Sequence, residues 1–178
     1  MKFFIGIVPP EDIYSAVVNI QNKFGDNRLE PHITLRPPVT VTQQDQWITA
    51  IEKVCATLSP VKINLPGTGH FGNRVLFIEV VSEELTGLHN AVVKAIKPFE
   101  QIDAKSNGNE NYRPHLTLAR KWCGFTKHDF VDMKVLADEF LSGQQVCFTA
   151  NSVRIYHKPL PGGRYEPLKD VSLNTGLK

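Results

Sequence analysis

The sequence predicts an α+β fold made of two similar lobes that flank a central cleft. One order of predicted elements, strand, helix, strand, helix, strand, occurs twice, over residues 2–65 and 74–149. The middle strand of each copy carries the pattern His-x-Thr-hydrophobic, as His32-Ile33-Thr34-Leu35 and His115-Leu116-Thr117-Leu118. The length of 178 residues suits one domain. We therefore expect a single bilobal domain over residues 1–178, completed by strands within 152–173.

The first copy begins with a buried strand at residues 2–8, an apolar run that ends at two prolines. Glu11 and Asp12 indicate the first turn of a helix, because the helix dipole favours acids there, and residues 25–27 should end it. The first motif strand follows at residues 32–36, and we expect Pro37-Pro38 to stop it. Thr42 and Asp45 have the spacing of a loose capping box, which predicts a second helix from Thr42, before a short strand at 61–65.

The second copy begins after a predicted turn at residues 66–69. A strand at 74–81 precedes a helix that Ser82 should cap, and residues 101–112 have the composition of an exposed loop. Thr126 and Asp129 repeat the capping pattern at the start of a fourth helix, which Gly143 should end. Strands are expected at 146–149, 152–157 and 165–173, with a turn at 160–163 between the last two.

Composition narrows the classes of function. The net charge of +2 suits a small anionic substrate or a short nucleic acid, whereas non-specific DNA binding needs a clear basic stripe. Cys55, Cys123 and Cys147 are far apart in the sequence and lack metal-ligand spacing, so we expect reduced thiols. No apolar stretch is long enough to cross a membrane. We expect a cytoplasmic monomer with no membrane or DNA partner.

The two motifs have the residue types of an acid–base site for a phosphodiester. Successive side chains of a strand alternate between faces, so the His and the Thr of each motif share one face. One neutral imidazole can remove a proton while one imidazolium supplies a proton, and each threonine hydroxyl can bind one phosphate oxygen. Neither motif has a carboxylate cluster or second histidine nearby, so we expect no metal and no cofactor. The alternative, two core strands that each carry a buried, satisfied histidine, does not explain the duplication.

Other side chains are weaker candidates for substrate contacts. Arg36 shares the strand face of His32 by alternation and is a candidate ligand of the substrate phosphate, whereas alternation places Arg120 on the opposite face in a structural role. Tyr112 and Phe71 are candidates for stacking on a base, with core or loop packing as the alternative role of either, and Tyr156 is a candidate for lining the cleft. The remaining histidines lack the motif and are interpreted as ordinary: His70, His89, His128 and His157.

With these motifs in view, the chain resembles the 2H phosphoesterase superfamily, and within it the RNA 2′,3′-cyclic phosphodiesterase (2′-5′ RNA ligase) family. PHITL and RPHLTLAR resemble the two motifs of that family. FFIGIVPPEDI, GHFGNRVLFIEV with LTGLHNAVVKAI, and PGGRYEPL are similar to its N-terminal segment, its mid-chain strand and helix, and its closing hairpin. Arg36-Pro37-Pro38 departs from the aromatic-containing continuation that is more usual there. The resemblance implies antiparallel-rich sheets with helices on the outer side.

The resemblance also implies an activity and roles for the motif residues. It implies a metal-independent enzyme that opens RNA 2′,3′-cyclic phosphates to 2′-phosphates, with 2′-5′ ligation as a possible reverse activity. His32 and His115 would be catalytic, and Thr34 and Thr117 would bind phosphate. Two alternatives stay open: a phosphodiesterase for small cyclic nucleotides or a cyclic phosphate of ADP-ribose, and a non-catalytic protein that binds RNA ends. Intact copies of both motifs argue against the last, because binding alone needs no paired acid and base.

Overall fold

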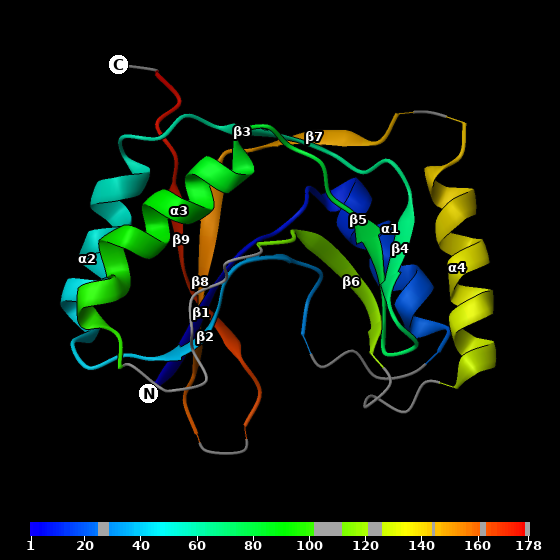
Figure 1. The fold of residues 1–178 in the computed structure, drawn as a ribbon, viewed down its shortest axis with the longest axis horizontal. Helices are drawn as coiled ribbons and strands as arrows, with labels where there is room; N and C mark the ends of the chain where they lie inside the picture. The colour runs from blue at the N-terminus through cyan, green and yellow to red at the C-terminus, as the bar shows by residue number, and fades with distance from the viewer. Residues whose placement is uncertain (25–28, 102–111, 121–125, 144, 161–162, 177–178) are drawn as a thin grey trace.

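Helices and antiparallel sheets make up the computed structural model, which describes residues 1–24, 29–101, 112–120, 126–143, 145–160 and 163–176 (Figure 1). Its elements are β1 (Lys2–Ile7), α1 (Glu11–Asn22), β2 (Ile33–Thr40), α2 (Gln44–Cys55), β3 (Val61–Asn64), β4 (Thr68–Phe71), β5 (Val75–Glu79), α3 (Leu85–Ile96), the short 3₁₀ helix η1 (Lys97–Phe99), β6 (His115–Arg120), α4 (Lys127–Leu141), β7 (Cys147–Ala150), β8 (Ser152–Lys158) and β9 (Glu166–Ser172). A seven-stranded sheet has the order β4-β5-β6-β2-β1-β8-β9, and β3 pairs with β7 separately. The predicted α+β class with antiparallel sheets is confirmed.

The four helices pack against one face of the large sheet. Alternate residues of β1, namely Phe3, Ile5 and Ile7, belong to the same buried core cluster as the apolar residues of the helices, such as Val17 of α1 and Val92 of α3. The residues between them on β1 face the other way, as the strand period of two requires. One face of each central strand therefore holds the core, and the opposite face is available for a site.

The large sheet consists of two halves that are joined at one cross-strand pair. β4, β5 and β6 form one half, while β2, β1, β8 and β9 form the other, and β6 pairs with β2 only at Ile33 and Leu116. Figure 1 shows α2 and α3 over the second half and α4 over the first. Helix α1 packs against β6 and α4, although it follows β1 in the chain, and α3 packs against β2 and α2, although it follows β5. Each of these helices therefore crosses to the half that holds the other motif.

Two strands depart from the sequence prediction. β2 does not stop at Pro37-Pro38 but continues to Thr40, because both prolines lie where the register between β1 and β2 is irregular and where β2 is not paired with β6. A missing N–H is tolerated at such positions. β4 occupies the predicted turn at residues 66–69 and extends beyond it, since Thr68–Phe71 pairs with Val75–Ile78 as a hairpin.

The predicted helix starts also differ in their outcome. Thr126 and Asp129 form the expected reciprocal capping box at the start of α4, and Gly143 follows that helix with a φ of 89°. Thr42 does not cap α2, because its hydroxyl donates to the Phe99 carbonyl and the helix begins at Gln44. Ser82 accepts a hydrogen bond from the Leu85 N–H, so it contacts the first residue of α3 from three positions before it.

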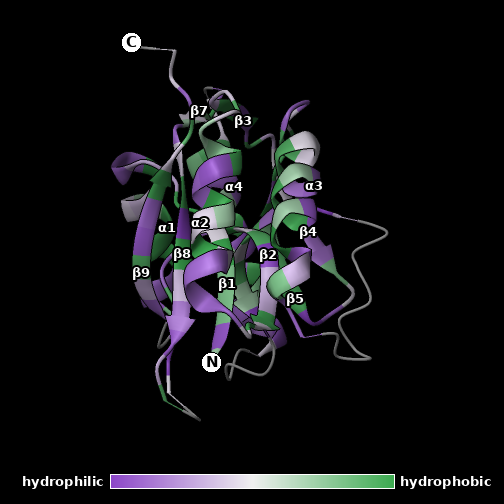
Figure 2. Cartoon of the chain, turned by 90° about the vertical axis from the view of Figure 1, so that its left-hand side faces the viewer, coloured by the Kyte–Doolittle hydropathy of each residue, from purple (hydrophilic) through white to green (hydrophobic). Residues whose placement is uncertain are grey.

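Some predictions remain untested by the described residues. Most of the predicted loop at 101–112, the helix end at 25–27, half of the turn at 160–163, and Cys123 lie outside them. The internal repeat and its boundaries stay predictions. No helix in the described part of the chain combines the length and apolar character needed to span a bilayer. Figure 2 shows the edge strand β9 mostly in hydrophilic colours, and charged side chains of this kind discourage edge-to-edge pairing.

Candidate active site

Both motifs present their His and Thr side chains on the face of the sheet that is turned away from the helices. Directly paired residues of antiparallel strands share a face. The pairs Gly6–Thr34, Phe4–Tyr156, Phe77–Thr117 and Glu79–His115 therefore lie together on this side. We call it the histidine face, and its central residues are Phe4, Gly6, His32, Thr34, Phe77, His115, Thr117 and Tyr156. The predicted sharing of one face within each motif agrees with this register.

The two motif imidazoles are oriented by the same backbone contact. Nδ1 of His32 lies 2.8 Å from the carbonyl oxygen of Glu30, and Nδ1 of His115 lies 2.9 Å from the carbonyl oxygen of Arg113. A carbonyl oxygen can only accept, so each Nδ1 carries the hydrogen. In each ring Nε2 is therefore the nitrogen that can take up or release a proton during a reaction. The contact spans two residues in both motifs, so the rings are held alike.

His32 packs against aromatic rings in the half of the large sheet that contains β1 and β8. Its ring centroid is 5.2 Å from that of Phe4 and 5.9 Å from that of Tyr156, and Phe4 and Tyr156 stack at 4.2 Å with an angle of 4°. Gly6 makes the close approach possible. A Cβ on Gly6 would lie only 3.3 Å from His32 Cδ2 and from the Ile33 carbonyl oxygen.

His115 also packs against aromatic rings, in the half of the large sheet that contains β4 and β5. Its ring is 5.0 Å from Phe71 in an edge-on arrangement and 5.1 Å from Phe77. The guanidinium of Arg113 lies 5.1 Å from the centroid of Phe71, in cation–π geometry. Phe77 lies over Gly69, where a Cβ would approach its ring to 2.6 Å. Phe71, a predicted stacking residue, is thus beside a motif histidine and only partly buried.

The surroundings lower the pKa of both histidines. For His32 the largest cause is burial, which the hydrogen bond to Glu30 opposes, and the charges of Arg120 and His115 lower the pKa further. For His115 the largest cause is again burial, opposed by the bond to Arg113, and the charges of Arg120 and Arg113 add to it. His115 acts on His32 and Arg120 acts on both, so the three cationic groups share one electrostatic neighbourhood.

A β-bulge follows the threonine of each motif and changes which arginine faces the site. On β2, Thr34 pairs with Gly6 while Arg36 pairs with Ile5, so Leu35 is the extra residue. On β6, Thr117 pairs with Phe77 while Ala119 pairs with Leu76, so Leu118 is the extra residue. An extra residue shifts the alternation of side chains beyond it to the opposite face.

The bulges reverse the predictions for Arg36 and Arg120. Arg36 shares the face of Ile5, is buried, and forms an ion pair with Glu100 through bonds of 2.6 and 3.1 Å, so the prediction that it contacts substrate phosphate is wrong. Arg120 returns to the histidine face, where its Nη2 lies 3.5 Å from the Thr117 hydroxyl oxygen. The alternation rule failed at both positions because a bulge leaves no clear mark in the sequence.

Tyr112 and Tyr156 support the motif strands rather than present a free ring. The Tyr112 ring stacks on His89 at 3.9 Å, and its hydroxyl donates to the Thr34 carbonyl. Tyr156 is fully buried with its ring stacked on Phe4, and its hydroxyl donates to Glu30 Oε1 at 2.7 Å. Burial raises the pKa of both phenols, so they remain neutral donors. The predictions that Tyr112 stacks on a base and that Tyr156 lines a substrate cleft therefore do not fit their positions.

Glu30 is a residue that the sequence did not single out. Its backbone carbonyl orients His32, and its carboxylate accepts hydrogen bonds from Tyr156 and from Arg154 Nη1 at 2.9 Å. Arg154 also holds Asp170 of β9 with bonds of 2.6 and 2.7 Å. No sequence pattern marks Glu30 itself. The nearest signal is Gly6, because a glycine inside an apolar strand often marks a close approach of another group, here the His32 ring.

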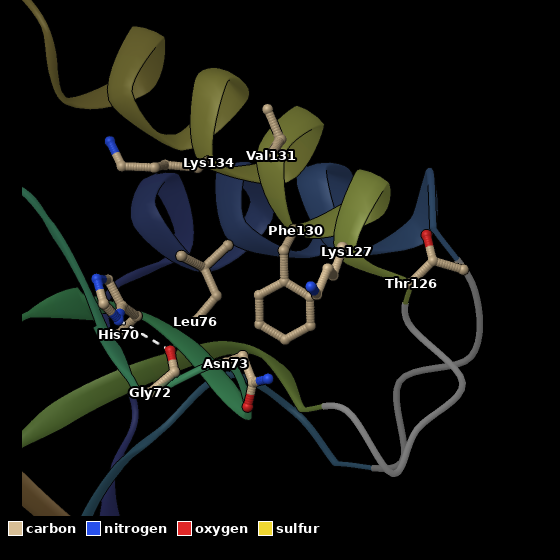
Figure 3. Close-up of a pocket in the computed structure, with 9 residues that line it drawn as sticks. All are labelled: His70, Gly72, Asn73, Leu76, Thr126, Lys127, Phe130, Val131 and Lys134. Atoms are coloured by element: carbon tan, nitrogen blue, oxygen red, sulfur yellow. Dashed lines mark hydrogen bonds between the residues drawn. The ribbon is translucent and has the colours of Figure 1, made fainter.

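A cavity of about 330 Å³ lies on the other side of the β4–β5 hairpin, against the start of α4 (Figure 3). His70 and Leu76, which pair directly, face it together with Phe130, while Phe71 and Phe77 contact His115. The cavity is therefore separate from the histidine face. Among the described residues, no group of three or more His, Cys, Asp or Glu side chains could hold a metal ion.

Fold and paired motifs define a two-histidine (2H) phosphoesterase. The sequence matches the model of the 2′-5′ RNA ligase superfamily over residues 9–131, and the chain belongs to that superfamily. Its members are phosphoesterases and RNA ligases, which places this chain among enzymes of the phosphodiesterase type. No curated protein matches the sequence significantly.

Solved structures share the fold over nearly the whole chain. TT0787 of Thermus thermophilus has 18% sequence identity over 98% of this chain and 99% of its own, with a TM-score of 0.71. Escherichia coli LigT in its apo form has 16% identity over 98% of both chains, with a TM-score of 0.64. At these identities the similarity establishes the fold.

Proposed function

We propose that the protein is a metal-independent phosphodiesterase that hydrolyses RNA 2′,3′-cyclic phosphate ends to 2′-phosphates, with a reversible 2′-5′ RNA ligase activity at the same site. The observation that carries the proposal is the matched pair of imidazoles. In both, Nδ1 is bound to a carbonyl two residues earlier and the ring belongs to a motif with a threonine on the same face. The positive charge of Arg120 lowers the pKa of both. Such a pair suits general acid–base chemistry on an anionic ester.

In the proposed reaction each histidine moves one proton. Nε2 of one neutral imidazole removes a proton from water, whose oxygen forms the new bond to phosphorus. The bond from phosphorus to the O3′ atom breaks, and the Nε2–H of the other, protonated imidazole gives its proton to that leaving oxygen. The product is a 2′-phosphate with a free 3′-hydroxyl. The same steps with a 5′-hydroxyl in place of water as the attacking group would form a 2′-5′ linkage and release the 3′-hydroxyl.

The threonines and Arg120 would neutralise the phosphate. The hydroxyls of Thr34 and Thr117 donate to the two non-bridging oxygens, and Arg120, beside the Thr117 hydroxyl, adds a positive charge. Phe71 and Arg113 lie next to His115 and offer a flat surface for a nucleobase. Structures of LigT with 3′-AMP and with phosphate, which share this fold, support a nucleotide phosphate as the ligand.

The test is a hydrolysis assay on a nucleoside 2′,3′-cyclic phosphate and on a short RNA that ends in one, with EDTA present throughout. We expect turnover by the wild type and a loss of at least about 100-fold in His32→Ala and in His115→Ala, the usual contribution of a positioned acid or base. The double variant should be little worse than either single one, because the pair acts as a unit. His128→Ala, at an exposed histidine of α4, is the matched control and should retain full activity.

The same assay separates the alternatives. Preference for mononucleotides or for a cyclic phosphate of ADP-ribose over the RNA would favour a small-molecule enzyme. Binding without turnover would favour an RNA-end-binding protein. Phosphorus NMR of the products identifies the isomer, and a 3′-phosphate as the main product would refute the proposed orientation of the ribose.

A further inference from the structure

Tyrosine, tryptophan and cysteine aside, the polar side chains that are buried in the described part of the chain all lie at the two motif bulges. They are Gln21 of α1, Arg36 of β2 and His89 of α3, with exposed fractions of 5%, 8% and 4%. Burying a polar group is costly unless it forms hydrogen bonds. Their gathering at the bulges therefore points to a task that apolar side chains could not perform there.

Gln21 binds the bulge that follows the second motif. Its Nε2 lies 3.2 Å from the carbonyl oxygen of Thr117 and 3.2 Å from that of Leu118. Leu118 is the extra residue of β6, and Thr117 is the threonine immediately before it. One amide group thus holds two successive peptide planes, the first of which is attached to the Cα of the threonine.

His89 and Tyr112 bind the corresponding carbonyls of the first motif. His89 Nδ1 lies 2.7 Å from the carbonyl oxygen of Leu35, the extra residue of β2, and the Tyr112 hydroxyl donates to the Thr34 carbonyl at 3.2 Å. The two rings stack with an angle of 5°, which fixes both donors. The same pair of carbonyls, that of the threonine and that of the next residue, is therefore held in both motifs by different chemical groups.

The helices that supply these donors belong to the stretches of chain that lead into the other motif. α1 precedes the first motif but holds the bulge of the second, and α3 precedes the second motif but holds the bulge of the first. The two halves of the sheet are otherwise paired only at Ile33 and Leu116. Each contact therefore ties one motif strand to a helix from the stretch of chain that leads into the other motif.

We propose that Gln21 and His89 are positioning residues, which fix the Thr117 and Thr34 hydroxyls by holding the backbone carbonyls at the two bulges. The inference rests on the proposed function, because it takes these threonines as the phosphate ligands. Neither side chain reaches the histidine face, since both lie in the helix layer beneath it. They act on the phosphate through the direction of the peptide planes above them.

The experiment compares Gln21→Leu and His89→Phe, which preserve size but remove the donor, with Val17→Ala and Val92→Ala. The two valines are buried on the same helices, but their side chains have no hydrogen-bond donor for the bulge carbonyls. They therefore control for lost stability. Per folded molecule, kcat for a cyclic phosphate should fall about tenfold or more in the first pair, as for other groups that orient ligands. The pH profile should not move, because neither histidine of the site is touched.

His89→Gln supplies the rescue, because the amide of Gln21 already performs this task at the second motif. It should recover much of the turnover that His89→Phe loses. Equal kcat per folded molecule in donor-lacking variants and valine controls, with a wild type that is active, would overturn the positioning role and leave the proposed function standing.

A second measurement covers the case in which the wild type hydrolyses no cyclic phosphate. Calorimetric binding of adenosine 2′-monophosphate then reports the alignment of the threonines directly. Weaker binding in Gln21→Leu and His89→Phe than in the valine controls would support the positioning role although the proposed activity had failed. Equal affinities, or no binding by the wild type, would refute it.

Discussion

At the scale of single residues, the site depends on imidazoles that are easily deprotonated. Burial and neighbouring positive charge both favour the neutral form of His32 and of His115. An acid–base pair needs one of them charged and one neutral. Since both pKa values lie below the ordinary 6.5, the free enzyme should have its optimum of kcat/KM on the acid side of that value, rather than centred at neutrality.

Arg120→Gln tests this electrostatic coupling. The positive charge of Arg120 opposes protonation of both imidazoles, so its removal should raise both pKa values and move both limbs of the bell-shaped kcat/KM profile to higher pH. Arg113→Gln is the matched control. Arg113 acts on His115, so this variant should move mainly one limb. The apparent pKa values of the profile belong to the coupled pair of histidines. If neither limb moved in Arg120→Gln, the electrostatic effect of Arg120 on the two histidines would be contradicted.

Gly6→Ala tests the close packing of His32 on β1. A Cβ would lie 3.3 Å from the imidazole and from a backbone oxygen, so the ring must shift by a few tenths of an ångström. Small misplacements of catalytic groups are costly, and we expect kcat/KM to fall about tenfold. Gly87→Ala, in α3 with nothing near its Cβ, should keep full activity and gain about 1 kcal/mol of stability. Wild-type activity in Gly6→Ala would remove the packing argument.

At the scale of elements, the sequence predicted the order of strands and helices well, because apolar periodicity and caps are local signals. Bulges are not local signals. The extra residues Leu35 and Leu118 are ordinary strand residues, and only the pairing with β1 and β5 shows that they interrupt the alternation. The predictions for Arg36 and Arg120 failed for this one reason. β4 was missed because Pro66-Gly67 resembles a turn, and its pairing with β5 outweighs its weak strand composition.

Thr126→Ala tests the one capping box that was both predicted and found. The Thr126 hydroxyl accepts from the Asp129 N–H, and bonds from the Thr126 backbone and then from its hydroxyl lower the pKa of Asp129. Losing a threonine cap costs about 1 kcal/mol in typical helices. The Asp129 carboxylate contributes part of this stabilisation, because its pKa is lowered in the folded protein. That contribution is fully present above the ordinary aspartate pKa of 3.8 and is lost as the pH falls through the lower pKa of the folded state.

Urea unfolding at several pH values measures this difference. The gap between wild type and Thr126→Ala should be full at neutral pH and should shrink in acid. Thr42→Ala is the informative comparison, because Thr42 was predicted to cap α2 and instead contacts Phe99. A gap for Thr126→Ala that stays constant down to strongly acid pH would show that Asp129 takes no part in the cap.

At the scale of the whole molecule, two halves of one sheet bring similar motifs together from distant parts of the chain. The repetition of the motif predicted that the two histidines meet, and the lowering of the His32 pKa by the charge of His115 agrees with this. The exchange of α1 and α3 between the halves could not be predicted, because it depends on which apolar faces pack together in space. The exchange is also what brings Gln21 and His89 to the bulges.

The central claim, that one histidine supplies the proton for the leaving oxygen and the other removes a proton from water, is tested by changing the leaving atom. The measurement is the turnover of wild type, His32→Ala and His115→Ala on a cyclic phosphate and on its analogue with sulfur at the leaving position. A thiolate leaves without being protonated, so the variant that lacks the acid should regain most of its activity on the analogue, and the variant that lacks the base should not. Equal behaviour of the two variants on both substrates would contradict the division of roles between His32 and His115.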